Sequence, residues 1–270
     1  MEIDNIYNMD CLEGMKQLED NSVDMVLTSP PYDNLRTYDN DIDKSWGEHV
    51  WKPILAELFR VTKQGGVVVW VVNDATINGS ETGTSFRQAL YAMACVFNLH
   101  DTMIFKKTNP IPQIYRKRYN NEFEYMFVFS KGNVKTHNPI KVPCLHAGLQ
   151  LKGTTYKNFS VGEQTRTKLA NPVKEEKIKG NIWEYVVGKK QIDQEAKKHP
   201  APFPFELARD HVVSWSNEND VVLDPFMGSG TTAIACIREK RHYIGFEKSE
   251  EYWRKSMERI RNELSQPTLF

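Results

Sequence analysis

A short apolar run that two prolines bring to an abrupt end does most to constrain how this 270-residue chain folds. Residues 23–27 have the length and character of a buried strand, and Pro30 and Pro31 follow just after it. Neither proline has an N–H and each fixes φ, so the turn is stiff and its carbonyl groups point in fixed directions. Open α/β sheets bind ligands at the carboxyl ends of their strands. The turn is therefore predicted to form part of a ligand site.

The residue types in this turn suit chemistry at an exocyclic amino group of a nucleobase. Such a nitrogen is a poor nucleophile because its lone pair is delocalised into the ring. Two acceptors that hold its two hydrogens favour the nucleophilic, tetrahedral form, and Ser29 and the Pro30 carbonyl are candidates for them. Tyr32 offers a face on which a flipped base could stack. A turn that merely ends a strand is the alternative, and the turn alone does not decide between them.

Strand-like and helix-like segments alternate along much of the chain. Strands are expected at residues 3–7, 23–27, 67–72, 102–105, 122–130, 221–224 and 242–246, and helices at residues 12–18, 49–61, 84–97, 203–215 and 249–264. Strands that alternate with helices imply a largely parallel sheet with helices on both faces. The expected fold class is therefore α/β. Residues 33–46 are polar and are expected to form a loop over the site.

A second constraining segment, residues 221–233, reads as a strand, a glycine turn and a helix start. Gly228 and Gly230 let a ligand approach the backbone, and a helix N-terminus favours a carboxylate or phosphate there. Glu247 ends the next strand, where an acid can accept hydrogen bonds from a ribose diol. A dinucleotide enzyme usually opens with this unit, and a P-loop would need a lysine after the glycines. A ligand with one ribose and a carboxylate remains, and S-adenosylmethionine (SAM) has both.

The charge of the chain is zero overall but unevenly distributed. Residues 101–200 carry 19 basic and 9 acidic side chains, a net charge of +10. A basic middle fits contact with phosphates, whereas a solvated lysine-rich surface is the alternative. Basic and aromatic residues interleave in the loop 106–121, as nucleic-acid contacts require. The predicted DNA contacts are Lys106, Lys107, Arg116, Lys117 and Arg118.

Two motifs together resemble a known family. They are Thr-Ser-Pro-Pro-Tyr at residues 28–32 and Asp-Pro-Phe-Met-Gly-Ser-Gly-Thr-Thr at residues 224–232. They resemble the amino-methylating DNA methyltransferases, which modify N4 of cytosine or N6 of adenine. Their order along the chain resembles the permuted beta class. The resemblance implies a Rossmann-like, SAM-dependent methyltransferase fold with a seven-stranded, mostly parallel sheet. It assigns residues 1–132 and 199–270 to the catalytic, SAM-binding domain and residues 133–198 to an inserted target-recognition region.

The same resemblance implies roles for individual residues. The catalytic residues would be Ser29, Pro30, Pro31 and Tyr32. The cofactor contacts would be Asp10, Cys11, Thr28, Phe203, Asp224, Pro225, Phe226, Gly228, Ser229, Gly230, Thr231, Glu247 and Lys248. Asp10 and Cys11 would contact the adenine of SAM, although Asp10 could instead cap the helix that follows it.

The implied reaction needs duplex DNA, one flipped base and in-line attack of its amino nitrogen on the SAM methyl group. In this family a serine before Pro-Pro-Tyr is commoner among cytosine-N4 enzymes, and an aspartate or asparagine is usual among adenine-N6 enzymes. Ser29 therefore favours cytosine N4, with adenine N6 as the alternative. An RNA or protein methyltransferase, a non-catalytic DNA-binding relative and, most remotely, a nicotinamide oxidoreductase are the other functions left open.

The expected partners are double-stranded DNA, a second copy of the chain and a cognate restriction endonuclease, the last two by family resemblance alone. The sequence contains neither a long apolar span nor a signal-type N-terminus, so no membrane association is expected. A cytoplasmic protein of prokaryotic or phage type is predicted. The four cysteines are scattered without the spacing of metal or disulfide sites, so no metal is expected.

Overall fold

The computed structural model describes residues 1–31, 46–110, 117–150, 154–157, 165–168, 172–187 and 204–265. The chain divides into two compact units. The larger unit comprises Met1–Asn138 and Asn181–Phe270, and the smaller one is Pro139–Gly180. No described helix has the length and apolar character needed to cross a membrane.

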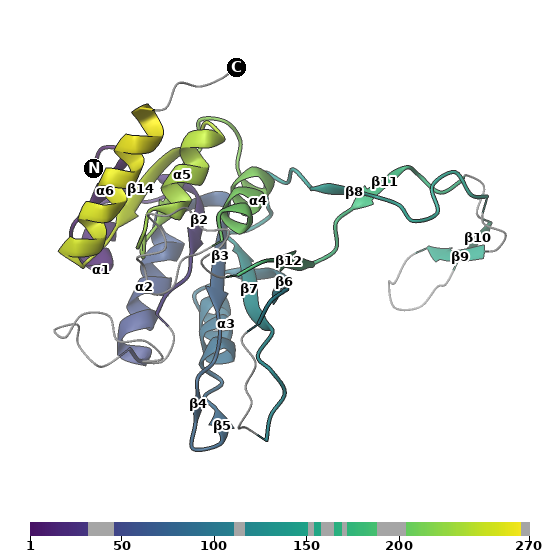
Figure 1. Ribbon diagram of the computed structural model, residues 1–270, viewed down its shortest axis with the longest axis horizontal. Helices are drawn as coiled ribbons and strands as arrows, with labels where there is room; N and C mark the ends of the chain where they lie inside the picture. The colour runs from purple at the N-terminus through teal and green to yellow at the C-terminus, as the bar shows by residue number, and fades with distance from the viewer. Residues whose placement is uncertain are drawn as a thin grey trace. The chain divides into compact units, whose positions relative to one another are not determined.

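The larger unit is built on an eight-stranded sheet with the order β1-β14-β13-β2-β3-β7-β6-β12 (Figure 1). Its strands are β1 (Asn5–Tyr7), β2 (Val23–Thr28), β3 (Thr62–Val72), β6 (Asn98–Lys107), β7 (Phe123–Ser130), β12 (Ile182–Tyr185), β13 (Val221–Asp224) and β14 (His242–Phe246). Among these strands β7 is antiparallel to both neighbours, and the other pairs are parallel. The predicted α/β class with a mostly parallel sheet is confirmed.

The eighth strand corrects the expected count of seven. β12 comes from the range assigned to the insert, yet it pairs in parallel with β6, from Ile182 opposite Ile104 to Tyr185 opposite Lys107. Its residues alternate between exposed and buried, and Trp183 and Tyr185 are the buried ones. A four-residue strand is too short to show this alternation clearly in a polar, lysine-rich stretch. Two buried aromatic side chains nevertheless suffice to attach it to the edge of the sheet.

Helices cover both faces of this sheet (Figure 1). They are α1 (Cys11–Met15), α2 (Glu48–Val61), α3 (Thr84–Ala94), α4 (Phe205–Trp215), α5 (Thr231–Arg238) and α6 (Glu250–Ser265). Val68, Trp70 and Val72 of β3 belong to the core that α1, α2 and α3 cover. The alternate residues of β3 are buried as well, as expected for a strand with a helix layer on each face. Helix α4 packs on β2 and β3, and α5 packs on β14 and between α4 and α6.

The sheet order brings two distant motifs together. β2 and β13 are neighbours, with Leu223 opposite Val26, so both strands end at the same edge of the sheet. The turn after Thr28 and the glycine turn after Asp224 therefore lie side by side, although almost 200 residues separate them in the chain. The parallel strands β1, β14 and β3 also end at this edge. It is the edge at which α/β sheets bind ligands.

Substitution of Gly14 by alanine is expected to destabilise the fold, because α1 approaches the end of β14 closely at this residue. A Cβ atom on Gly14 would lie 2.2 Å from Cε1 of the buried Phe246 ring. Overpacking of a buried contact costs about 1–3 kcal/mol, which opposes the roughly 1 kcal/mol that alanine gains over glycine in a helix. Urea unfolding should show a net loss for Gly14→Ala and little change for Gly180→Ala, whose Cβ would meet nothing within 4 Å. A Gly14→Ala variant more stable than the wild type would contradict this packing.

The smaller unit contains two short antiparallel strand pairs. β8 (Lys141–Pro143) pairs with β11 (Glu176–Ile178), and β9 (Thr154–Lys157) pairs with β10 (Thr165–Lys168). In the first pair, two further backbone bonds link Cys144 to Glu175 and Lys179 to Ile140. These elements fall inside the range 133–198 that the sequence assigns to target recognition. That role stays a prediction.

Candidate active site

One buried carboxylate connects the two motifs at the carboxyl edge of the sheet. The hydroxyl of Thr28 donates to Oδ1 of Asp224 at 2.7 Å, and the hydroxyl of Thr232 donates to Oδ2 at 2.6 Å. The backbone N–H of Phe226 also donates to Oδ1, at 3.0 Å. Asp224 thus fixes the end of β2, the glycine turn and the first turn of α5 relative to one another. The Ser29-Pro30 turn, which continues from Thr28, is held beside the glycine turn.

Burial raises the pKa of Asp224 from its ordinary value of 3.8 to about 6, and its three hydrogen bonds offset this only in part. The folded chain keeps the proton up to about pH 6, whereas the unfolded chain releases it near pH 4. Stability should therefore fall as the pH rises from about 4 to about 6 and stay level above that, with a contribution from this group of about 3 kcal/mol.

This pH dependence can be isolated with the variant Asp224→Asn, which keeps the shape of the side chain but does not titrate. The difference in free energy of unfolding between the wild type and this variant should shift by about 3 kcal/mol between pH 4 and pH 7, in favour of the variant at higher pH. Urea unfolding at several pH values measures it. Parallel curves for the two proteins would show that Asp224 is not the titrating group.

The glycine turn places backbone N–H groups around a second carboxylate. Gly228 and Gly230 have φ values of 51° and 78°, in the left-handed region that favours glycine, and Gly230 is the N-cap residue of α5. The N–H of Gly228 donates to Oε2 of Glu247 at 2.9 Å, and the N–H of Ser249 donates to Oε1 at 2.8 Å. Burial raises the pKa of Glu247, and these amide bonds counteract the rise. A carboxylate that accepts hydrogen bonds from two amides keeps further lone pairs, with which it can accept hydrogen bonds from hydroxyl groups.

The end of β1 adds a third group of side chains to this edge. Oδ1 of Asp10 accepts the N–H groups of Leu12 and Glu13 at 2.9 and 3.4 Å, so Asp10 does cap α1. Its side chain remains exposed, and a cap that uses one oxygen does not prevent contact with a ligand. Cys11 is buried, and burial raises the pKa of its thiol to about 12, which keeps it protonated at neutral pH. A hydrogen-bonding or packing role suits Cys11, and a nucleophilic role does not.

The remaining predicted site residues differ in how open they are to a ligand. Pro30, Pro225, Gly228, Gly230 and Thr231 are buried, Ser29, Pro31, Phe226 and Ser229 are half-buried, and Lys248 is exposed. The Thr28 hydroxyl donates a hydrogen bond to the Asp224 carboxylate, so these two residues support the site in this structure. Tyr32, Phe203 and residues 33–45 of the predicted loop 33–46 lie outside the described residues.

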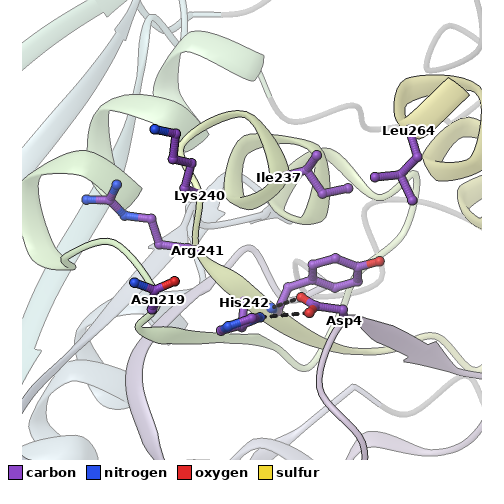
Figure 2. Close-up of a pocket in the computed structure, with 8 residues that line it drawn as sticks. Asp4, Asn219, Ile237, Lys240, Arg241, His242 and Leu264 are labelled. Carbon is purple, nitrogen blue, oxygen red and sulfur yellow. Dashed lines mark hydrogen bonds and ion pairs between the residues drawn. The ribbon is translucent and has the colours of Figure 1, made fainter. Parts of the chain in front are cut away.

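A cavity of about 330 Å³ lies away from this edge, where β13 and β14 begin (Figure 2). Figure 2 shows His242 and Asp4 paired on its wall, with 2.7 Å between Nδ1 and Oδ2. Lys240, Arg241 and Asn219 also line it. No predicted site residue is among its lining residues, so this cavity is separate from the candidate active site. Within the described part of the chain, no group of three or more His, Cys, Asp or Glu residues could hold a metal ion.

Comparison with known proteins decides the family. The model of a family described as DNA methylase (N6_N4_Mtase) matches residues 23–258, most of the chain. The chain belongs to this DNA methylase family. It is 47% identical over 253 residues to the orphan methyltransferase M.BamHII of Bacillus amyloliquefaciens, with 92% of each protein covered. It is 28% identical over 254 residues to the type II methyltransferase M.BglII of Bacillus subtilis, which covers 93% of this chain and 67% of that protein.

Solved structures of this fold agree with the architecture. PvuII DNA methyltransferase (cytosine-N4-specific) superimposes with a TM-score of 0.71 at 18% identity, covering 98% of this chain and 88% of that one. The M1.HpyAVI–SAM complex superimposes with a TM-score of 0.58 at 21% identity, covering 94% and 98%. These structures support the fold, and the family match with the 47% identity to M.BamHII confirms the sequence-based prediction of a DNA methyltransferase of the N4/N6 type, whose substrate is DNA.

The predicted DNA contacts of this DNA methylase lie partly at the same edge as the site. Lys106 and Lys107 end β6, which runs in the same direction as β3. Lys106 pairs with Glu184 at 2.9 Å, and Lys107 pairs with Glu124 at 2.8 Å with little of either side chain exposed. Arg118 bonds to Glu81 and to the carbonyl of Gly79. Lys117 is exposed, and Arg116 lies outside the described residues.

Two residues that the sequence did not assign to the site, Asn8 and Arg259, support it in the structure, together with Trp46 of the predicted loop 33–46. Nδ2 of Asn8 donates to the carbonyls of Glu247 and Lys248 at 2.9 and 3.2 Å, which joins the ends of β1 and β14. Trp46 contacts the Phe226 ring edge-on, with 5.6 Å between the centroids. Arg259 of α6 donates to the glycine turn. Asn8 directly follows a predicted strand, which was a usable signal, whereas nothing local distinguishes Arg259 from the other charged residues of its helix.

Proposed function

We propose that this DNA methylase transfers a methyl group from SAM to the exocyclic amino group of a base flipped out of duplex DNA, with cytosine N4 as the favoured position. The link from Thr28 through Asp224 to Thr232 carries the proposal. It holds an acceptor-rich turn next to a glycine turn that suits a nucleoside with a carboxylate. Methyl transfer requires this proximity of two binding sites, because positioning is the main contribution of the protein.

The residues at the glycine turn fit SAM. The amides of Ser229 and Thr231 have no hydrogen-bond partner among the described residues, and they suit the carboxylate end of the cofactor. Glu247 would accept the ribose hydroxyls, and Asp10 with Cys11 would border the adenine. SAM supplies an activated methyl group on a sulfonium centre. The protein therefore aligns the amino nitrogen of the base with this methyl group and does not supply a nucleophile of its own.

Ser29 and Pro30 would prepare that nucleophile. Their hydroxyl and carbonyl oxygens would accept the two amino hydrogens of the base, which concentrates the nitrogen lone pair toward the methyl group. Tyr32 would stack on the base and hold it outside the helix. Ser29 is also the reason to favour cytosine, because a carboxylate at this position is usual among adenine enzymes. No covalent bond between protein and base is required.

We also propose that the smaller unit, Pro139–Gly180, contributes to target recognition within the predicted insert 133–198. A second copy of the chain and a cognate endonuclease remain predictions from the family resemblance. M.BamHII is named an orphan methyltransferase. The cytoplasmic location also stays a prediction.

Two binding experiments test this function. Titration calorimetry should give heat of binding for SAM and none for NAD. Filter binding in the presence of a SAM analogue should retain duplex DNA in preference to RNA of the same sequence or a basic peptide. Retention of RNA over DNA would redirect the proposal to an RNA methyltransferase, and binding of NAD alone would overturn it.

A further inference from the structure

Helix α6 supports the glycine turn from behind through a buried arginine. Arg259 is 6% exposed, unlike the other arginines of α6, and its Nη1 points at the turn. This atom donates to the carbonyl of Ser229 at 2.9 Å and to the hydroxyl of Thr231 at 3.0 Å. Ser256, one helical turn earlier, is fully buried, and a Cβ on Gly230 would lie 3.2 Å from its Cβ. The last helix therefore contacts the turn at two successive levels.

These contacts fix the orientation of one peptide group. The carbonyl of Ser229 accepts from Arg259, and the N–H of Gly230, which belongs to the same peptide plane, donates to the carbonyl of Met227 at 2.9 Å. Both polar atoms of the plane are therefore held, so the plane cannot rotate without the loss of a hydrogen bond. The flanking amides of Ser229 and Thr231 have no hydrogen-bond partner among the described residues.

A buried guanidinium at this place also has an electrostatic consequence. It is always charged, and a positive charge next to a half-enclosed turn favours an anion there. The same charge would stabilise a carboxylate that the amides of the turn bind, and it would add nothing to the binding of an uncharged nucleoside. The effect is therefore specific to the end of the cofactor that carries the carboxylate.

We propose that Arg259 is a positioning residue that preorganises the glycine turn for the carboxylate of the cofactor. The inference rests on the proposed function, because it needs a cofactor of the SAM type. Arg259 donates to the turn itself, so its role is to hold two amides in place and to supply charge through the turn.

The test compares two ligands that differ in the amino-acid group. S-adenosylhomocysteine has the carboxylate, and 5′-methylthioadenosine has the same nucleoside without it. In Arg259→Gln, the Kd of S-adenosylhomocysteine should rise about 10- to 100-fold, the loss expected for hydrogen bonds to a charged group, while the Kd of methylthioadenosine changes less than about threefold. Arg259→Lys keeps the charge and should recover part of the affinity. In steady-state assays the KM for SAM should rise with little change in kcat.

Arg254→Gln on the same helix is the matched control, because Arg254 is exposed and pairs with Glu250. It should bind both ligands as the wild type does. If Arg259→Gln does not fold, Arg259→Lys alone should weaken the binding of S-adenosylhomocysteine, to a smaller extent, and leave that of methylthioadenosine unchanged. Equal weakening of both ligands, or no weakening, would overturn the role of Arg259. Wild-type protein that binds neither ligand would instead overturn the proposed function, and this role with it.

Discussion

The Ser29→Ala variant is expected to lose methyl transfer while it keeps its affinity for SAM. Removal of one hydrogen-bonding group aimed at the reacting centre costs about 10²- to 10³-fold in kcat in enzymes of other classes, and a similar loss is expected here. Ser29 follows directly from Thr28, whose hydroxyl is bonded to Asp224, so this hydrogen bond still holds the start of the turn in the variant. Single-turnover transfer to duplex DNA and calorimetric SAM binding, measured on the same preparation, separate the two effects.

Ser22→Ala provides the control for this variant. Ser22 lies just before the other end of β2, and its hydroxyl donates to the carbonyl of Glu19 at 2.7 Å. Its removal should leave transfer unchanged. Ser29→Thr retains a hydroxyl and should retain measurable activity. A Ser29→Ala enzyme that methylates DNA at a near-normal rate would exclude Ser29 from the acceptor role.

The Gly230→Val variant is expected to lose SAM binding by about 100-fold or more. Gly230 has a φ of 78°, which a β-branched residue adopts only with strain, and its new Cβ would lie 3.2 Å from Cβ of the buried Ser256. The turn would have to move away from α6, and loss of its amide hydrogen bonds to the charged carboxylate of SAM accounts for an effect of this size. Calorimetry with SAM measures the affinity, and thermal unfolding reports the cost to the fold.

Gly83→Val is a matched control for the backbone strain. Gly83 is the N-cap residue of α3 with φ 63° and ψ 20°, close to the 78° and 20° of Gly230 at the start of α5. A Cβ there would meet nothing within 4 Å. Both variants should lose stability, but only Gly230→Val should lose SAM affinity. Equal SAM affinity in the two variants would show that the glycine turn is not the cofactor site.

The fold could be predicted largely because local patterns and topology agree. The apolar runs that become β2 and β13 are each followed by a distinctive turn, and parallel strands place such turns at one edge. β12 could not be predicted, because its four residues alternate between exposed and buried positions only once the strand pairs with β6. The predicted start of α1 was one residue late, since Asp10 caps a helix that begins at Cys11 and not at residue 12.

Within the site, residues in contiguous motifs were easier to predict than their supports. The motifs identified Thr28 and Asp224, but only the structure shows that their polar atoms are bonded to each other. Arg259 supports the glycine turn from 30 residues away in the sequence, through the placement of a helix. Contacts of that kind depend on tertiary packing, which no local spacing encodes.

Nucleoside analysis of methylated DNA shows whether this protein transfers a methyl group, and to which base. The protein is incubated with labelled SAM and duplex DNA of mixed sequence, and the DNA is then digested to nucleosides for mass spectrometry. We expect N4-methylcytosine, with label absent when Ser29→Ala replaces the wild type. N6-methyladenine would preserve the site and cofactor but contradict the base inferred from Ser29. No methylated nucleoside, from DNA that the protein binds together with SAM, would contradict the proposed transfer itself.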